Sequence, residues 1–196
     1  MKSSSLLIAL CLTGLSAGAF AQTTQQIQQR DVSQQHRIEN GLQSGSLNTR
    51  EAGALERDQK RLASTEARDL KNGKLSNAER RQLTRMENKD SRDIHEAKTN
   101  GVRGDPLSTS SQRMQADVQR NVTQDQRIDN GIKNGSLTNR EVGRLDQGQA
   151  HVDGKEAGAA KSGYVNSHEQ RGVQSAENNQ SRRIHKLKTN IVNRKG

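Results

Sequence analysis

The sequence has very little cysteine, aromatic residue or proline. Its single cysteine, Cys11, lies in an N-terminal segment that we expect to be removed, so the rest of the chain excludes disulfides, thiol nucleophiles and thiolate metal sites. Phe20 and Tyr164 are the only aromatic residues, which excludes sites that stack bases or sugars on several rings. The only proline is Pro106.

Long apolar runs are also missing. The longest spans residues 6–15, which is shorter than the roughly 20 residues that cross a bilayer. It follows Lys2 and precedes Ala19-Phe20-Ala21, which is the pattern of a secretory signal cleaved before Gln22. We therefore predict a signal peptide over residues 1–21, no transmembrane anchor, and a periplasmic or secreted location.

An internal repeat organises the remaining chain. Shifting the sequence by ninety positions aligns residues 32–102 with residues 122–192 without a gap, and the matches include Arg37 with Arg127 and Ile38 with Ile128. The segment between the copies contains Pro106 with glycine and serine around it, which is typical of a linker. The predicted units are residues 22–100 and 112–196, joined by a linker over 101–111.

Inside each copy, a second and weaker shift of 28 positions reveals a turn, G-x-[LV]-[NST]-x-x-E, that occurs four times. Its glycine can end a helix in the left-handed conformation. The residue three positions after the glycine is a helix N-cap type, and the glutamate three positions further on completes a capping box. The predicted turn residues are Gly45, Glu51, Gly73, Glu79, Gly135, Glu141, Gly163 and Glu169.

These turns predict an all-α fold made of two tandem three-helix units, each built from helix-turn-helix hairpins. We place the helices at residues 26–43, 49–71 and 77–99 in the first copy and 112–133, 139–161 and 167–192 in the second. Hydrophobic residues make up only 28% of the chain, and each unit of about 75 residues can draw only about 3–5 kcal/mol from one core. We therefore expect a marginal core, with stability that depends on packing between the copies.

The spacing of glycine and glutamate in these turns is similar to the second half of a calcium-binding EF-hand loop. Calcium needs several oxygen ligands earlier in that loop. The third loop position is apolar in all four turns, where it holds Leu42, Leu70, Ile132 or Ala160. We therefore interpret the turns as metal-free helix connections, with a calcium- or metal-responsive EF-hand-like sensor as the alternative.

Other patterns of catalysis or metal binding are missing. The five histidines are scattered and do not make a zinc site, and no nucleophile triad or phosphate loop is present, so we predict neither an enzyme nor a cofactor. Glu66 and Glu156 lie on the apolar stripe of the middle helices, where a buried carboxyl group has a raised pKa. We interpret them instead as ion pairs with Arg81 and Arg171.

Charge provides the main hint of function, because the chain carries a net charge of +10. No acidic residue follows Glu177. The C-terminal part therefore predicts a surface for polyanions, which outside the cytoplasm are lipid phosphates, lipopolysaccharide, acidic wall polymers or released nucleic acid. Cytoplasmic nucleic acid is not an expected partner. The candidate binding residues are Arg182, Arg183, Lys186, Lys188, Arg194 and Lys195.

With its export signal, its R-I-[ED]-N-G opening at Arg37 and Arg127 and its S-R-x-I-H ending at Ser91 and Ser181, the chain resembles a group of small exported proteobacterial helical-repeat proteins. That resemblance implies export and a helical fold, but no activity. The stretch 137–141, Leu-Thr-Asn-Arg-Glu, is also similar to the L-T-x-x-Q turns of Spy/CpxP-type periplasmic stress chaperones. The predicted function is non-enzymatic binding of envelope polyanions or client proteins.

Overall fold

Six long helices form the protein in the computed structural model, which describes residues 23–190. They are α1 (Thr24–Gln43), α2 (Thr49–Asp69), α3 (Asn77–Thr99), α4 (Thr109–Lys133), α5 (Asn139–Ala159) and α6 (Ser167–Thr189). Single 3-10 turns, η1 (Leu70–Asn72) and η2 (Ala160–Ser162), extend α2 and α5. The all-α prediction is confirmed, since the described residues contain no strand. The predicted signal peptide lies outside them.

The predicted helix limits agree with the observed ones to within three residues, because local caps fix them. The side chains of Asn48, Ser76, Thr138 and Asn166 each cap a helix, and in each case the glutamate three residues later accepts a bond from the cap's own N–H. The glycines before these caps have φ between +70° and +86°, a backbone conformation that disfavours a side chain. The largest differences in helix limits are at the start of α4 and the end of α6.

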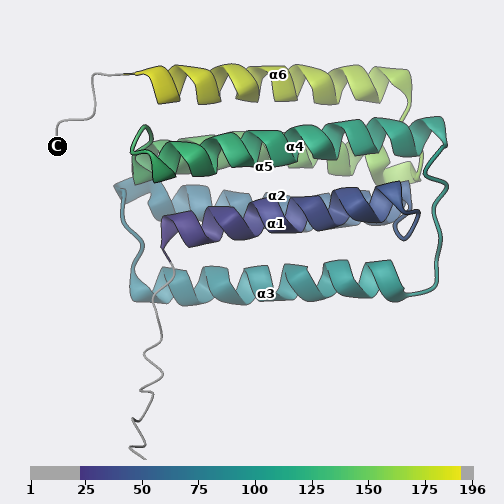
Figure 1. Cartoon of the computed structure of the whole chain (residues 1–196), viewed down its shortest axis with the longest axis horizontal. Helices are drawn as coiled ribbons and strands as arrows, with labels where there is room; N and C mark the ends of the chain where they lie inside the picture. Colours follow the sequence, from purple (N-terminus) through teal and green to yellow (C-terminus); the bar gives the residue numbers. More distant parts are fainter. Residues whose placement is uncertain (1–22, 191–196) are drawn as a thin grey trace, which may run out of the picture.

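The helices are arranged in layers, as Figure 1 shows. The hairpin α1–α2 faces the hairpin α4–α5 across the middle of the molecule, while α3 and α6 cover the two outer sides. The closest pairs join the two copies: α2 packs on α5, and α1 packs on α4. The copies therefore meet through their first two helices, and the third helix of each copy lies outside. No helix within residues 23–190 is long and apolar enough to cross a membrane.

The apolar residues form two clusters, and each cluster draws on both copies. One joins Ile38, Leu55 and Ile94 of the first copy to Met114, Val118 and Val173 of the second. The other joins Leu62, Leu70 and Leu83 to Ile128, Leu145 and Ile184. Neither copy keeps an apolar core of its own, so packing between the copies provides the burial that one 75-residue unit lacks.

Small residues let α2 and α5 approach closely where they cross. A Cβ added at Gly53 would lie 2.4 Å from the Cβ of Ala160, and one added at Gly143 would lie 2.8 Å from the Cβ of Leu70. Gly53 and Gly143 are equivalent positions of the two copies, and they meet equivalent partners. The duplicated chain thus has an approximate twofold symmetry, in which α2 and α5 exchange places.

The close contact at Gly53 leads to a first prediction. Gly53→Ala should lower the free energy of unfolding by up to about 2 kcal/mol, because overpacking costs about 1–3 kcal/mol and better helix propensity offsets roughly 1 kcal/mol. Gly172→Ala is the matched control, since Gly172 is exposed on α6 and no atom lies within 4 Å of its added Cβ. The control should be stabilised by up to about 1 kcal/mol. Urea unfolding of both variants measures the difference, and an equal gain at the two sites would contradict the close packing of α2 on α5.

Candidate functional site

The centre of the molecule, between the two apolar clusters, is lined by acidic side chains. Four helices contribute them: α1, α2, α4 and α5 each place at least one carboxylate in the interior. Each of these residues is more than nine-tenths buried. We call the set the carboxylate centre, and it consists of Asp31, Glu56, Glu66, Asp125, Asp146, Asp153 and Glu156.

These carboxylates lack cationic partners. No ion pair within the described residues involves any member of the carboxylate centre. Two members are held by amides: Gln35 donates to Glu56 Oε2 at 3.0 Å, and Asn121 donates to Glu156 Oε2 at 2.8 Å. One carboxylate oxygen on each of five members is buried without a hydrogen-bond partner, namely on Asp31, Glu56, Glu66, Asp153 and Glu156. Such groups are costly unless a proton or a cation compensates them.

Burial dominates the electrostatics of the centre. Desolvation raises the pKa of Glu56 to about 7, although the bonds from Gln35 and Glu156 act in the opposite direction. The pKa values of Asp31 and Glu66 are raised well above their ordinary values by burial first and by neighbouring carboxylates second. The pKa values of Asp125 and Asp146 are also raised, by burial first and by a neighbouring carboxylate second. At neutral pH the centre therefore holds protons that exposed carboxyl groups would release.

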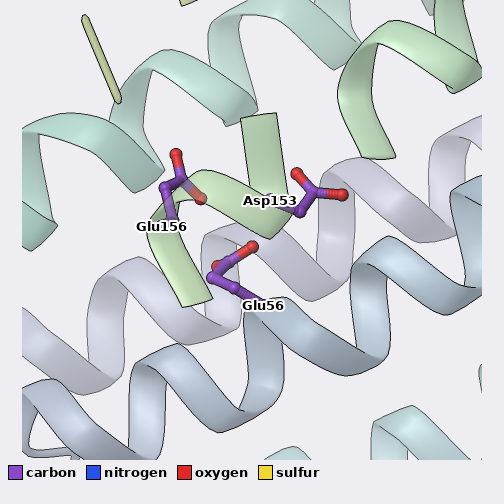
Figure 2. A group of neighbouring side chains, drawn as sticks. All are labelled: Glu56, Asp153 and Glu156. Atoms are coloured by element: carbon purple, nitrogen blue, oxygen red, sulfur yellow. The ribbon is translucent and has the colours of Figure 1, made fainter. Parts of the chain in front are cut away.

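Three members of the centre converge. Glu56 on α2 and Asp153 and Glu156 on α5 each offer an oxygen, and these oxygens all lie within 4.8 Å of one another. Figure 2 shows Glu56 pointing from α2 toward α5, with the two α5 carboxylates beside it. The i, i+3 spacing of Asp153 and Glu156 puts both on one face of α5. We call these three residues the acidic trio.

A small cavity adjoins the trio. Its volume is about 20 Å³, which is enough for one water molecule or one ion. Carboxylates from all four inner helices line it together with amides, and the acidic lining residues are Asp31, Glu66, Asp125, Asp146 and Asp153. The cavity is therefore a polar one, shared by both copies.

The predicted ion pairs of Glu66 and Glu156 are wrong. Both glutamates are buried in the centre, whereas Arg81 and Arg171 are exposed on α3 and α6. Arginine pairs occur instead at the outer sides. Arg30 lies 3.3 Å from Glu87, and the equivalent Arg120 lies 3.3 Å from Glu177. The inner carboxylates face other carboxylates because the opposite copy, and not the outer helix, covers them.

The glutamates of the four turns accept hydrogen bonds from backbone N–H groups. Glu51 Oε2 accepts a bond from the N–H of Asn48 at 3.0 Å, and Glu141 Oε2 accepts one from the N–H of Thr138 at 2.9 Å. Glu79 and Glu169 do the same in the other two turns. The turns thus place these carboxylates against helix N-termini, away from the buried centre. Within the described chain, His, Cys, Asp or Glu groups converge at two places, and the trio is the fully buried one. The other place, formed by Asp58, Asp90 and Asp93 on α2 and α3, is partly exposed, and Lys89 pairs with Asp58 and Asp93.

A second feature lies on the surface, over the crossing of α2 and α5. It is a groove of about 1080 Å³, and twelve residues from both copies line it. Six of these residues carry a permanent positive charge, and none is acidic. We call it the basic groove, and its cationic residues are Lys60, Arg68, Lys71, Arg140, Arg144 and Arg183, with His151 beside them.

The two copies share part of the charge of the basic groove. At the positions ninety residues away, Arg68 is replaced by Gly158, Arg144 by Ala54 and Arg183 by Asp93. Lys71 and Arg140 keep their charge as Lys161 and Arg50, and Gln147 and His151 correspond to Arg57 and Arg61. The symmetry-related positions are therefore also cationic, but unlike the groove they include an acidic residue.

Of the C-terminal basic residues predicted from sequence, Arg183 lies in this groove, where it also donates to the carbonyl of Arg144 at 3.0 Å. Arg182 donates to Asn179, and Lys188 donates to the carbonyl of Arg127 at 2.7 Å. Lys186 is exposed on α6. Arg194 and Lys195 lie outside the described residues. Sequence reasoning missed the α2 and α5 members because they belong to different copies.

No family model, curated protein or solved structure matches the chain.

Proposed function

We propose that the protein is an exported, non-enzymatic binder of polyanions, which it holds in the basic groove. The observation that carries the proposal is the lining of the groove, with six permanent cations and no acid. Lys71, Arg140 and Arg144 are exposed, and none of them forms an ion pair with another residue in the described range 23–190. Their charges are free to meet phosphate or carboxylate groups of a ligand.

The shape and chemistry of the groove favour a flexible, repeating anion over a compact molecule. The charges extend along two antiparallel helices from Lys60 to Lys71 and from Arg140 to His151, which suits a chain of phosphates or acidic sugars. Aromatic residues are missing from the lining, so binding by stacking is not expected. With the predicted export signal, the matching ligands are lipopolysaccharide, anionic lipid headgroups and acidic wall polymers.

Charge reversal within the groove tests this proposal. The mature chain should bind labelled polyphosphate and vesicles rich in phosphatidylglycerol, and binding should weaken steeply between about 50 mM and about 200 mM salt. Arg140→Glu with Arg144→Glu should weaken binding at least about tenfold at the lower salt, since each basic residue near an anionic surface contributes about 1 kcal/mol. Fluorescence anisotropy and vesicle sedimentation measure both effects.

The matched control is Arg81→Glu with Arg85→Glu on α3. It makes the same change of net charge with the same i, i+4 spacing, at exposed positions outside the groove. It should weaken binding by no more than about threefold, through the change in net charge alone. Equal losses in the two double variants would refute a groove-specific function. Binding of unfolded client proteins in place of either anion would support the chaperone-like alternative and overturn the polyanion proposal.

A further inference from the structure

The acidic trio has the dimensions of a cation site. Three oxygens that lie within 4.8 Å of one another have a common centre no more than about 2.8 Å away, and calcium takes oxygen ligands at about 2.3–2.6 Å. All three carboxylates can therefore contact such an ion with little movement. Magnesium binds at about 2.0–2.1 Å in a strict octahedron and gives up its water ligands reluctantly, which a buried site beside a cavity of about 20 Å³ does not favour.

The second observation is that one oxygen of each carboxylate has no partner outside the trio. Glu56 Oε1, Asp153 Oδ1 and Glu156 Oε1 are buried, and no other described residue donates a hydrogen bond to them. The other carboxylate oxygens of Glu56 and Glu156 accept bonds from Gln35 and Asn121, so these two side chains are held in place while one oxygen of each remains open. This arrangement resembles a first shell of ligands oriented by a second shell of amides.

Charge and space also favour a cation. Asp31 and Asp125 face the same interior, and both line the adjoining cavity of about 20 Å³. No lysine, arginine or histidine lines that cavity. The interior therefore combines several carboxylates, no competing positive charge and room for a water ligand, which suits a hard cation that takes more than three oxygens.

The repeat determines how many such sites the molecule contains. Moving ninety positions along the chain relates Glu56 to Asp146 and Glu156 to Glu66, so two of the three carboxylates have equivalents on the other side of the symmetry axis. At that second position Ala63 replaces Asp153, whereas Asp125 and Asp31 replace the amides of Gln35 and Asn121. Within the described chain, the carboxylates of this second position do not converge as closely as those of the trio, so one site per chain is expected.

We propose that Glu56, Asp153 and Glu156 bind one hard cation of calcium's size in the interior of each chain. The site is separate from the basic groove and from the four helix turns. Its residues come from both copies, so a bound ion links α2 to α5 directly. Binding is therefore coupled to the packing of the two copies, and the ion raises the stability of the folded protein.

Calorimetric titration of the chelator-treated mature protein with calcium tests the proposal. The expected result is one site per chain with a Kd of about 1 mM or tighter, the range found in extracellular calcium modules. Magnesium should bind at least about tenfold more weakly, because of its shorter bonds. Terbium, which has a similar size, should occupy the same site, and its luminescence lifetimes in H₂O and D₂O should report few bound waters. Absence of calcium and terbium binding, or equal affinity for magnesium, would overturn the proposal.

Asp153→Ala assigns the site, because it introduces the residue that the other copy holds at this position. It should fold, as judged by circular dichroism, and lose at least about tenfold in calcium affinity. Asp90→Asn is the matched control: it removes a buried carboxylate on α3, outside the carboxylate centre and its cavity, and calcium should still bind with one site per chain. Glu56→Gln provides a second variant of the trio on the other helix. Unchanged affinity in Asp153→Ala and Glu56→Gln, or loss in Asp90→Asn alone, would rule out the trio as the site.

Discussion

In the presence of a chelator, the protein should be more stable near pH 5 than near pH 8, the reverse of the usual acid sensitivity. Burial raises the pKa of Asp117 to about 7 and that of Glu177 to about 8, although Arg120 opposes both shifts. Burial also raises the pKa of Asp90 to about 6 against the pull of Lys89. Members of the carboxylate centre shift in the same direction.

The direction of this pH dependence follows from the number of protons that the folded and unfolded states bind. The unfolded chain releases these protons near pH 4, whereas the folded chain keeps them until the pH passes the raised values. Between those limits the folded state binds more protons than the unfolded state, so stability falls as the pH rises. Each unit of difference between the folded and unfolded pKa corresponds to about 1.36 kcal/mol. Asp117 alone therefore destabilises the folded state by roughly 4 kcal/mol once the pH exceeds 7. Below about pH 4, repulsion among the growing number of positive charges limits the further gain in stability.

Thermal melts followed by circular dichroism across this pH range measure the effect. The melting temperature should be highest near pH 4–5 and should fall through about pH 8. Adding calcium at the higher pH should restore part of the loss, since a cation can replace the protons of the trio. A melting temperature that is highest near pH 8 without calcium would show that the buried carboxylates are compensated in another way.

The sequence predicted the helices well because their ends are local features. A glycine with positive φ, a capping residue and a glutamate three positions later determine each turn without help from the rest of the chain, as at Gly73, Ser76 and Glu79. The same turns recur in both copies, so the repeat marks the helix limits twice. The fold class therefore followed from short-range chemistry.

Of the carboxylate centre, the sequence indicated only Glu66 and Glu156, which lie on the apolar stripe of the middle helices. The other members were not predicted, because polar residues on a helix normally indicate a solvated face. Asp125 and Asp153 are buried only because the second hairpin packs on the first through α1–α4 and α2–α5 contacts. One signal was available: Gly53 and Gly143 occur at equivalent positions inside otherwise regular helices, where close helix packing is a reason to keep glycine. That packing also brings Arg68 and Arg140 into one groove.

Exchanging buried acids for the residues of the other copy should stabilise the protein. Asp31 corresponds to Asn121, and Asp125 corresponds to Gln35, so each position already has a neutral amide in the symmetry-related site. The double variant Asp31→Asn with Asp125→Gln should gain on the order of 1–4 kcal/mol near pH 8 without cations, since it removes two carboxyl groups that the fold must bury either charged or with a proton taken from the solution. Its stability should also depend less on pH than that of the unchanged protein.

Urea unfolding near pH 5 and near pH 8 checks both statements, with Glu96→Gln as the control because Glu96 is exposed on α3. The control should change stability by less than about 0.5 kcal/mol. A stability gain in the double variant that comes with weaker calcium binding would indicate that these acids are kept for a ligand at the expense of the apo fold. Loss of stability near pH 8 in the absence of calcium would contradict the buried, uncompensated state of Asp31 and Asp125.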